Sequence, residues 1–220
     1  MQLRSPLALA ALALASPALA GTVKGAVRLT GAAPALAPLT ITRDQTSCGA
    51  AVPDESVVAS NGRLANVVVV VRGAPAPPAA KAVVLDQQRC RFLPHVQAAP
   101  RGSSLEILNS DPVLHNSHGY LGQATAFNVA LPLKGQRVAR KLDKVGPMKV
   151  KCDVHPWMSA FVVVTDGPAA VSGSDGTFAV AGVPAGSYTV TAWHERFGER
   201  TAQVTVPASG EATVDFTFGG

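Results

Sequence analysis

The stretch CDVHPWM, residues 152–158, brings three side chains with metal-binding atoms close together along the chain. Cys152 offers a thiolate, His155 an imidazole nitrogen and Met158 a thioether sulfur. The whole chain has only three cysteines, five histidines and three methionines, so one of each type within a short loop indicates a specific use. Sulfur and imidazole ligands favour transition metals over Mg²⁺ or Ca²⁺. The loop therefore predicts a metal centre.

A second histidine for this centre is available in the upstream segment NSDPVLHNSHGY. We expect His115 to join Cys152 and His155. His118 is expected at the surface or beside the ligands; the alternatives are that it replaces His115 or joins it as an extra ligand. Two imidazoles, one thiolate and a weak axial thioether suit copper in both oxidation states. Zinc fits less well, because a thioether is a poor zinc ligand.

These two segments resemble the cupredoxin family. The resemblance rests on the pattern Cys-x-x-His-x-x-Met with Pro156 after the histidine, and on the upstream pair His115-Asn116. The loop is most similar to that of amicyanin, among the plastocyanin-like members. Residues 102–165 carry the resemblance, which implies a Greek-key β-sandwich.

Carried over position by position, the resemblance implies one type 1 (blue) copper ion. Its ligands would be a thiolate, two imidazoles and an axial thioether, from His115, Cys152, His155 and Met158. The backbone N–H of Asn116 would bond to the thiolate.

The electron would leave through an exposed edge of the His155 ring, by the same resemblance. Pro156 and Trp157 flank that histidine and would form a small apolar patch for partner docking. The implied protein is a one-electron carrier and not an enzyme. Its partner would be a redox protein such as a c-type cytochrome or a periplasmic dehydrogenase. The whole chain is also similar to exported proteins labelled as methylamine-utilisation proteins.

Two other functions remain open from the residues alone. One is a periplasmic carrier or sequestering protein that holds Cu(I) without redox turnover. The other is a metal-free β-sandwich that binds a partner. The charges are scattered and show no basic run alternating with aromatic residues, so nucleic-acid binding is not expected.

Residues 1–20 have the build of a secretory signal peptide cleaved before Gly21, with Arg4 near the start, an apolar Leu/Ala run and the ending Ala18-Leu19-Ala20. We therefore expect a periplasmic protein with no membrane span after cleavage. Loss of Arg4 lowers the formal net charge by one from +5. A mildly basic surface could attract an acidic protein partner.

Cys48 and Cys90 lie far from Cys152 in the sequence, in an oxidising compartment. If these two pair, the disulfide would stabilise the fold by roughly 4 kcal/mol in the chain-entropy model. Cys152 would then be the unpaired thiol.

The chain reads as all-β, because valine-rich runs alternate with turn residues and no helical period is sustained after residue 20. We assign residues 21–165 to the copper domain. The segment 102–109 places Leu105 and Ile107 on one face. The continuous apolar run of residues 66–75 predicts a strand covered on both faces, and we expect it in the same domain.

Residues 166–220 predict a second, smaller β-sandwich. They resemble the carboxypeptidase regulatory-like, transthyretin-like sandwich through Asp175-Gly176, Val183-Pro184 and Tyr188. So short a segment makes a thin core. The strand predicted at residues 22–31 could complete it, which would make the second domain discontinuous.

Overall fold

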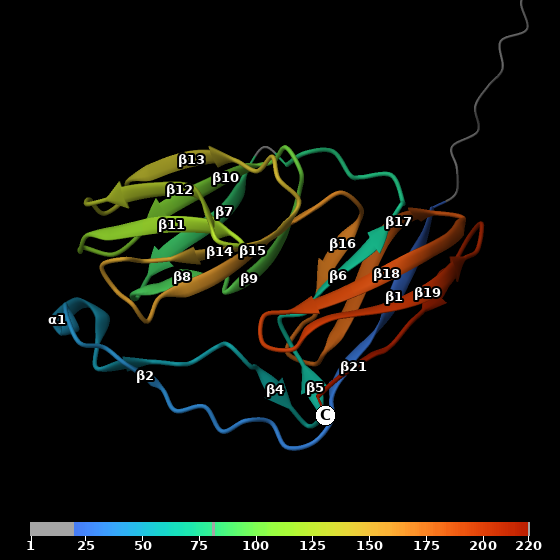
Figure 1. Ribbon diagram of the computed structural model, residues 1–220, viewed down its shortest axis with the longest axis horizontal. Helices are drawn as coiled ribbons and strands as arrows, with labels where there is room; N and C mark the ends of the chain where they lie inside the picture. The colour runs from blue at the N-terminus through green and yellow to red at the C-terminus, as the bar shows by residue number, and fades with distance from the viewer. Residues whose placement is uncertain (1–19, 81, 220) are drawn as a thin grey trace, which may run out of the picture.

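The computed structural model describes residues 20–80 and 82–219 as two β-sandwiches lying side by side (Figure 1). The prediction of an all-β fold is confirmed: the described part is built from strands, with one short helix, α1 (Gln45–Cys48). No described helix is long and apolar enough to cross a membrane. The predicted signal peptide, apart from Ala20, lies outside the described residues.

The first sandwich contains two sheets, with strand orders β13-β10-β7-β8 and β12-β11-β14-β15-β9. Most neighbouring strands are antiparallel, but β7 and β10 pair in parallel, as do β9 and β15. The strands of the first sheet are β7 (Val83–Gln88), β8 (Arg91–Leu93), β10 (Ser104–Asn109) and β13 (Arg137–Lys141). Those of the second are β9 (Val96–Pro100), β11 (His115–Leu121), β12 (Ala124–Leu131), β14 (Gly146–Lys151) and β15 (Ser159–Thr165).

Alternating side chains build the core between these two sheets. In β10, Leu105 and Ile107 are buried as predicted, and in β14 Met148 and Val150 are buried while the lysines between and after them are exposed. Successive strand residues point to opposite faces, so this alternation leaves one apolar face for the core. Cys152 continues the buried set of β14 beyond the end of the strand.

The second sandwich is discontinuous in sequence. Its strands include four from the first part of the chain: β1 (Ala20–Leu29), β4 (Ala59–Ser60), β5 (Arg63–Leu64) and β6 (Val68–Arg72). The others are β16 (Ala169–Val171), β17 (Thr177–Pro184), β18 (Gly186–His194), β19 (Gly198–Val206), β20 (Glu211–Thr213) and β21 (Phe216–Phe218). One sheet has the order β16-β6-β18-β19; the other has the order β17-β1-β5-β4, with β20 and β21 also paired to β1. The alternative in which residues 22–31 complete this sandwich is therefore the observed one.

The placement of residues 66–75 in the first sandwich is wrong. Strand β6 pairs with β16 and β18, so it is part of the second sandwich. Its two faces explain the apolar run. Val69 and Val71 lie in the second core, while Val68 and Val70 pack with Phe161 of the first sandwich. The strand is covered on both faces as predicted. One face packs in the core of its own sandwich, and the other packs against the first sandwich.

Residues 41–52, here called the strap, run along the first sandwich before the chain returns to β4 and β5. In Figure 1 the strap lies below the left end of that sandwich. It contains α1 and β3 (Ala51–Val52), and β3 pairs with β2 (Leu39–Thr40) just before it. Ile41, Cys48 and Val52 are buried in the first core. The pairing of Cys48 with Cys90 is confirmed and fixes the strap to the turn between β7 and β8.

A buried ion pair joins the two sandwiches. His95 Nε2 contacts the carboxylate of Glu195, and His95 Nδ1 lies 3.1 Å from the carbonyl oxygen of Ser159. Burial lowers the pKa of His95, but the hydrogen bond and the negative charge of Glu195 outweigh it, with a further contribution from Glu55, and the pKa is raised. The charged histidine therefore stabilises the folded protein.

This pair predicts a stability difference that depends on pH. Because the folded pKa of His95 is raised, its contribution is full below the unfolded pKa of about 6.5 and is lost as pH rises through the folded value. We expect His95→Gln to lower the melting temperature at about pH 6 and to lower it less at about pH 9. Thermal unfolding of both proteins at the two pH values checks this. A difference in melting temperature that stays constant with pH would contradict it.

Candidate metal centre

Two adjacent strands bring the predicted ligands to the same end of the second sheet. His115 is the first residue of β11, and Cys152 follows directly after the last residue of β14. These strands are paired antiparallel, with His118 opposite Lys151. The loop that follows, residues 152–158, is here called the ligand loop. It carries His155 and Met158 before β15 begins. The two predicted ligands His115 and Cys152 are 37 residues apart in the sequence. They meet because β11 and β14 are neighbours.

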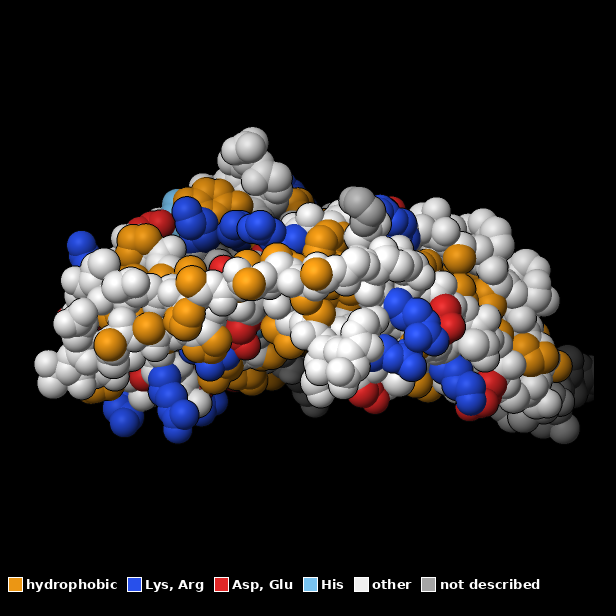
Figure 2. Space-filling view, turned by 90° about the horizontal axis from the view of Figure 1, so that it is seen from below, with side chains coloured by type: hydrophobic (Ala, Val, Ile, Leu, Met, Phe, Trp, Pro, Cys, Tyr) orange, Lys and Arg blue, Asp and Glu red, His pale blue; other side chains and the backbone are white. Residues whose placement is uncertain are grey.

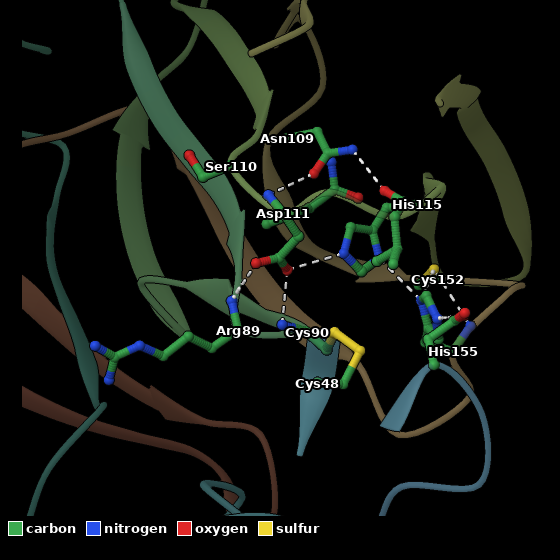
Figure 3. Close-up of polar contacts among 12 residues, drawn as sticks. Cys48, Arg89, Cys90, Asn109, Ser110, Asp111, His115, Cys152 and His155 are labelled. Carbon is green, nitrogen blue, oxygen red and sulfur yellow. Dashed lines mark hydrogen bonds and ion pairs between the residues drawn. A yellow bond between two sulfur atoms is a disulfide. The ribbon is translucent and has the colours of Figure 1, made fainter. Parts of the chain in front are cut away.

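His115, Cys152 and His155 form one buried cluster (Figure 3). Their ligand atoms all lie within 4.8 Å of one another. The two Nδ1 atoms of the histidines are 2.9 Å apart, and Cys152 Sγ is 3.7 Å from His155 Nδ1. All three side chains are essentially inaccessible to solvent.

A carboxylate holds the outer nitrogen of each histidine. Asp111 Oδ2 is 3.0 Å from His115 Nε2, and Asp44 Oδ2 is 2.9 Å from His155 Nε2. An ionised carboxylate only accepts hydrogen bonds, so each ring keeps a proton on Nε2. In the neutral rings both Nδ1 lone pairs are then directed at the centre of the cluster.

This arrangement fits a cation. The two Nδ1 atoms are 2.9 Å apart and lie next to the Cys152 sulfur. Their lone pairs and the sulfur are electron-rich, so they repel one another when no positive charge lies among them. A proton or a metal ion removes that repulsion. Two imidazole nitrogens and one thiolate are a donor set that binds late transition metals, with the outer nitrogens oriented by carboxylates as in many metal sites.

Backbone N–H groups stabilise the thiolate form of Cys152. The N–H groups of Asn116 and His155 donate to Sγ at 3.5 and 3.4 Å. Burial raises the pKa of the thiol, but the hydrogen bond with His115 and these backbone bonds outweigh it, and the pKa of Cys152 is lowered. A thiolate is the form that binds a metal.

Asp111 is itself held as a carboxylate by a network of bonds. It accepts the backbone N–H groups of Arg89 at 2.7 Å and Cys90 at 2.8 Å, and its own N–H donates to Asn109 Oδ1 (Figure 3). Burial raises the pKa of Asp111, but the bonds to His115 and to these two N–H groups lower it overall. For His115, burial lowers the pKa, yet its bonds to Asp111 and Cys152 raise it.

Met158 is buried at the end of the ligand loop, within the core of the first sandwich. Its N–H donates to the carbonyl of His155 at 2.9 Å, and its carbonyl accepts the N–H of Cys152 at 3.3 Å. These two bonds close the loop, so Cys152, His155 and Met158 are held by one compact turn.

The other predicted residues have different surroundings. Asn116 bonds through its side chain to Asn128 and Asp153, which joins β11 to the ligand loop. His118 lies outside the ligand cluster: its ring bonds to Asp153 and Thr125 and stacks on Tyr120. It is three residues from His115, and an odd spacing in a strand puts two side chains on opposite faces.

The expectation of an exposed His155 edge is wrong. The ring is 0% exposed, because the strap covers it and Asp44 occupies its outer nitrogen. Pro156 is exposed, but Trp157 is only partly so. The indole N–H of Trp157 donates to the carbonyl of Cys90 at 3.1 Å, so this side chain also holds the loop in place.

Two of the site's residues, Asp44 and Asp111, were missed by the sequence analysis. Asp111 stands four residues before His115 and is followed by Pro112, a pair that is typical of a turn and not of a functional site. Asp44 is 111 residues from His155 and carries no local signal. A second cluster of Cys90, Asp111 and His115 also has suitable spacing. Cys90 is in the disulfide, however, and offers no thiolate.

A comparison with protein families identifies a similarity in the C-terminal part of the chain. The family model described as the carboxypeptidase regulatory-like domain matches residues 155–219. Residues 166–219 of that match contain strands β16 to β21 of the second sandwich, whereas 155–165 belong to the ligand loop and β15 of the first. The C-terminal part is thus similar to the carboxypeptidase regulatory-like domain. No curated protein matches the chain.

Similar solved structures include copper proteins. A Cu(I) structure of an amicyanin variant shares 19% identity at a TM-score of 0.35, covering 44% of this chain and 98% of amicyanin. A second variant, in the reduced state, has 21% identity with the same score and coverage. The copper-containing nitrite reductase NirK from Thermus scotoductus SA-01 shares 20% identity at a TM-score of 0.34, covering 50% of this chain and 25% of NirK.

Proposed function

We propose that this chain is a type 1 copper protein that carries single electrons between redox proteins of the periplasm. One observation carries the proposal: two imidazole Nδ1 atoms and the Cys152 sulfur converge in a buried cluster while carboxylates hold both Nε2 atoms. Bound copper would supply the Cu(I)/Cu(II) couple, which takes up and releases one electron.

The residues around the cluster fit this role because they resist rearrangement. His115 is fixed by the pairing of β11 and by Asp111, and Cys152 is fixed by two backbone N–H groups. A ligand set that keeps its positions in both oxidation states lowers the cost of electron transfer. Met158 would add a weak thioether ligand from the same loop.

The partner would be a redox protein, such as a c-type cytochrome or a periplasmic dehydrogenase, with an acidic docking surface. Without Arg4 the formal net charge of the chain would be +4, with 18 Lys and Arg against 14 Asp and Glu. On the face seen in Figure 2, Lys and Arg side chains project in several small groups among scattered hydrophobic ones. Such a surface attracts a negatively charged partner, and the attraction weakens as salt concentration rises.

Titration of the metal-free protein with Cu(II), followed by visible absorption and voltammetry, tests the proposal. We expect one equivalent of copper, an intense thiolate-to-Cu(II) band and a reversible one-electron couple. Tight Cu(I) binding without a coloured, reversible state would instead support a copper carrier. Absence of copper uptake would support a metal-free binding module.

Replacing Met158 with leucine is expected to preserve copper binding and shift the reduction potential. Only a weak thioether ligand would be removed, and leucine has a similar volume. Met148→Leu is the matched control, because Met148 is buried in the same core on β14 but is not a proposed ligand. Voltammetry should show a shift for the first variant alone. Equal potentials in the wild type and Met158→Leu would remove Met158 from the ligand set.

A further inference from the structure

The strap contacts the cluster of His115, Cys152 and His155 through Asp44. The ring of His155 is fully buried although it lies on a surface loop, and Asp44 of the strap sits 2.9 Å from its Nε2 atom. The Asp44 side chain itself remains 42% exposed. This carboxylate therefore lies between the Nε2 atom of His155 and solvent.

The backbone at Asp44 is shaped for this contact. Asp44 precedes α1 at the N-cap position, where an aspartate commonly accepts a hydrogen bond from the helix's own N–H groups. Here the side chain makes no such bond. The residue instead adopts a left-handed conformation, with φ 54° and ψ 30°, and its carboxylate bonds to His155. This conformation is uncommon outside glycine, asparagine and aspartate.

The disulfide links the strap, which carries Asp44, to the turn whose backbone holds Asp111. Cys48 lies four residues after Asp44, and its partner Cys90 donates its backbone N–H to Asp111 at 2.8 Å. The carbonyl of Cys90 also accepts the indole N–H of Trp157 in the ligand loop. Strap, disulfide and ligand loop therefore form one connected support around the cluster.

We propose that Asp44 is a positioning residue for the metal centre and that the strap replaces solvent over His155. The carboxylate accepts the Nε2–H hydrogen bond, which fixes the Nδ1 lone pair toward Cys152 and His115 and makes the ring a stronger donor. This inference rests on the proposed function for its metal. An electron partner would then meet the strap, and not the bare imidazole.

Two substitutions separate the hydrogen bond from the charge. Asp44→Ala removes the acceptor, whereas Asp44→Asn keeps an acceptor oxygen without the negative charge. Gln45→Ala is the matched control. Gln45 lies next in the strap and bonds to the carbonyl of Ile41, so its loss weakens the strap without removing the contact to His155.

The first measurement uses metal-free protein and NMR of the histidine ring nitrogens. In the wild type and in Gln45→Ala we expect a protected Nε2–H on His155. In Asp44→Ala we expect a mixture of tautomers and fast exchange of that proton, with partial recovery in Asp44→Asn. The ring of His95, which contacts Glu195 away from the cluster, should keep its signals in every variant and thereby report correct folding.

The second measurement is the reduction potential of the copper-loaded proteins. A less basic His155 stabilises Cu(II) less, so the potential should rise in Asp44→Ala, rise less in Asp44→Asn and stay unchanged in Gln45→Ala. An unaltered His155 tautomer together with an unaltered potential in Asp44→Ala would overturn the inference. Because the NMR result needs no copper, it tests the action of Asp44 on His155 even where the Cu(II) titration refutes the proposed function.

Discussion

Replacing Cys152 with serine is expected to abolish the visible charge-transfer band completely while the protein stays folded. A serine hydroxyl is not ionised near neutral pH and cannot donate charge to Cu(II) as a thiolate does. The change is small in volume, and the backbone bonds among Cys152, His155 and Met158 still close the loop. Absorption after Cu(II) addition and thermal unfolding of the same sample measure the two effects.

Ser117→Ala provides the control for this substitution. Ser117 is buried on β11, two residues from His115, and its hydroxyl has no hydrogen-bond partner among the described residues. Its removal should leave the band unchanged. A Cys152→Ser protein that still turned blue would refute the assignment of the thiolate ligand.

The largest stability effect is expected from the double variant Cys48→Ala/Cys90→Ala. The disulfide closes a loop with a sequence separation of 42 residues. Without it, the unfolded chain gains freedom that costs the folded state roughly 4 kcal/mol in the chain-entropy model. Urea unfolding of metal-free wild type and variant measures this difference.

Thiol counts and a reductant supply the matching controls. Oxidised, metal-free wild type should contain one reactive thiol after unfolding, from Cys152, and the double variant should also contain one. Reduction of the wild type should lower its free energy of unfolding by about as much as the double substitution does. Equal free energies of unfolding for the oxidised wild type and the double variant would contradict a stabilising role for the bond.

Much of the fold was predictable because its information is local. Alternation in segments such as residues 104–109 gives one apolar face per strand, and the structure buries that face. The destination of β6 was not predictable in this way. A run buried on both faces has no alternation, and nothing in residues 66–75 says which sandwich supplies its hydrogen-bonding neighbours.

The ligand cluster was predictable for a similar reason. Cys152, His155 and Met158 share one loop, so their spacing in the sequence was enough to predict that they lie together. His115 was predicted from a second short motif. Asp44 was not predictable, because its contact with His155 depends on where the strap folds. The same long-range contact explains why the exposure expected for His155 was wrong.

X-ray absorption at the copper edge tests the central claim most directly, on wild type loaded with one equivalent of Cu(II) and compared with Cys152→Ser and His115→Ala. We expect one short copper–sulfur contact and two copper–nitrogen contacts in the wild type. The sulfur contact should vanish in the first variant, and one nitrogen contact in the second. A wild-type spectrum with oxygen and nitrogen neighbours only, unchanged in both variants, would contradict a copper centre at His115, Cys152 and His155.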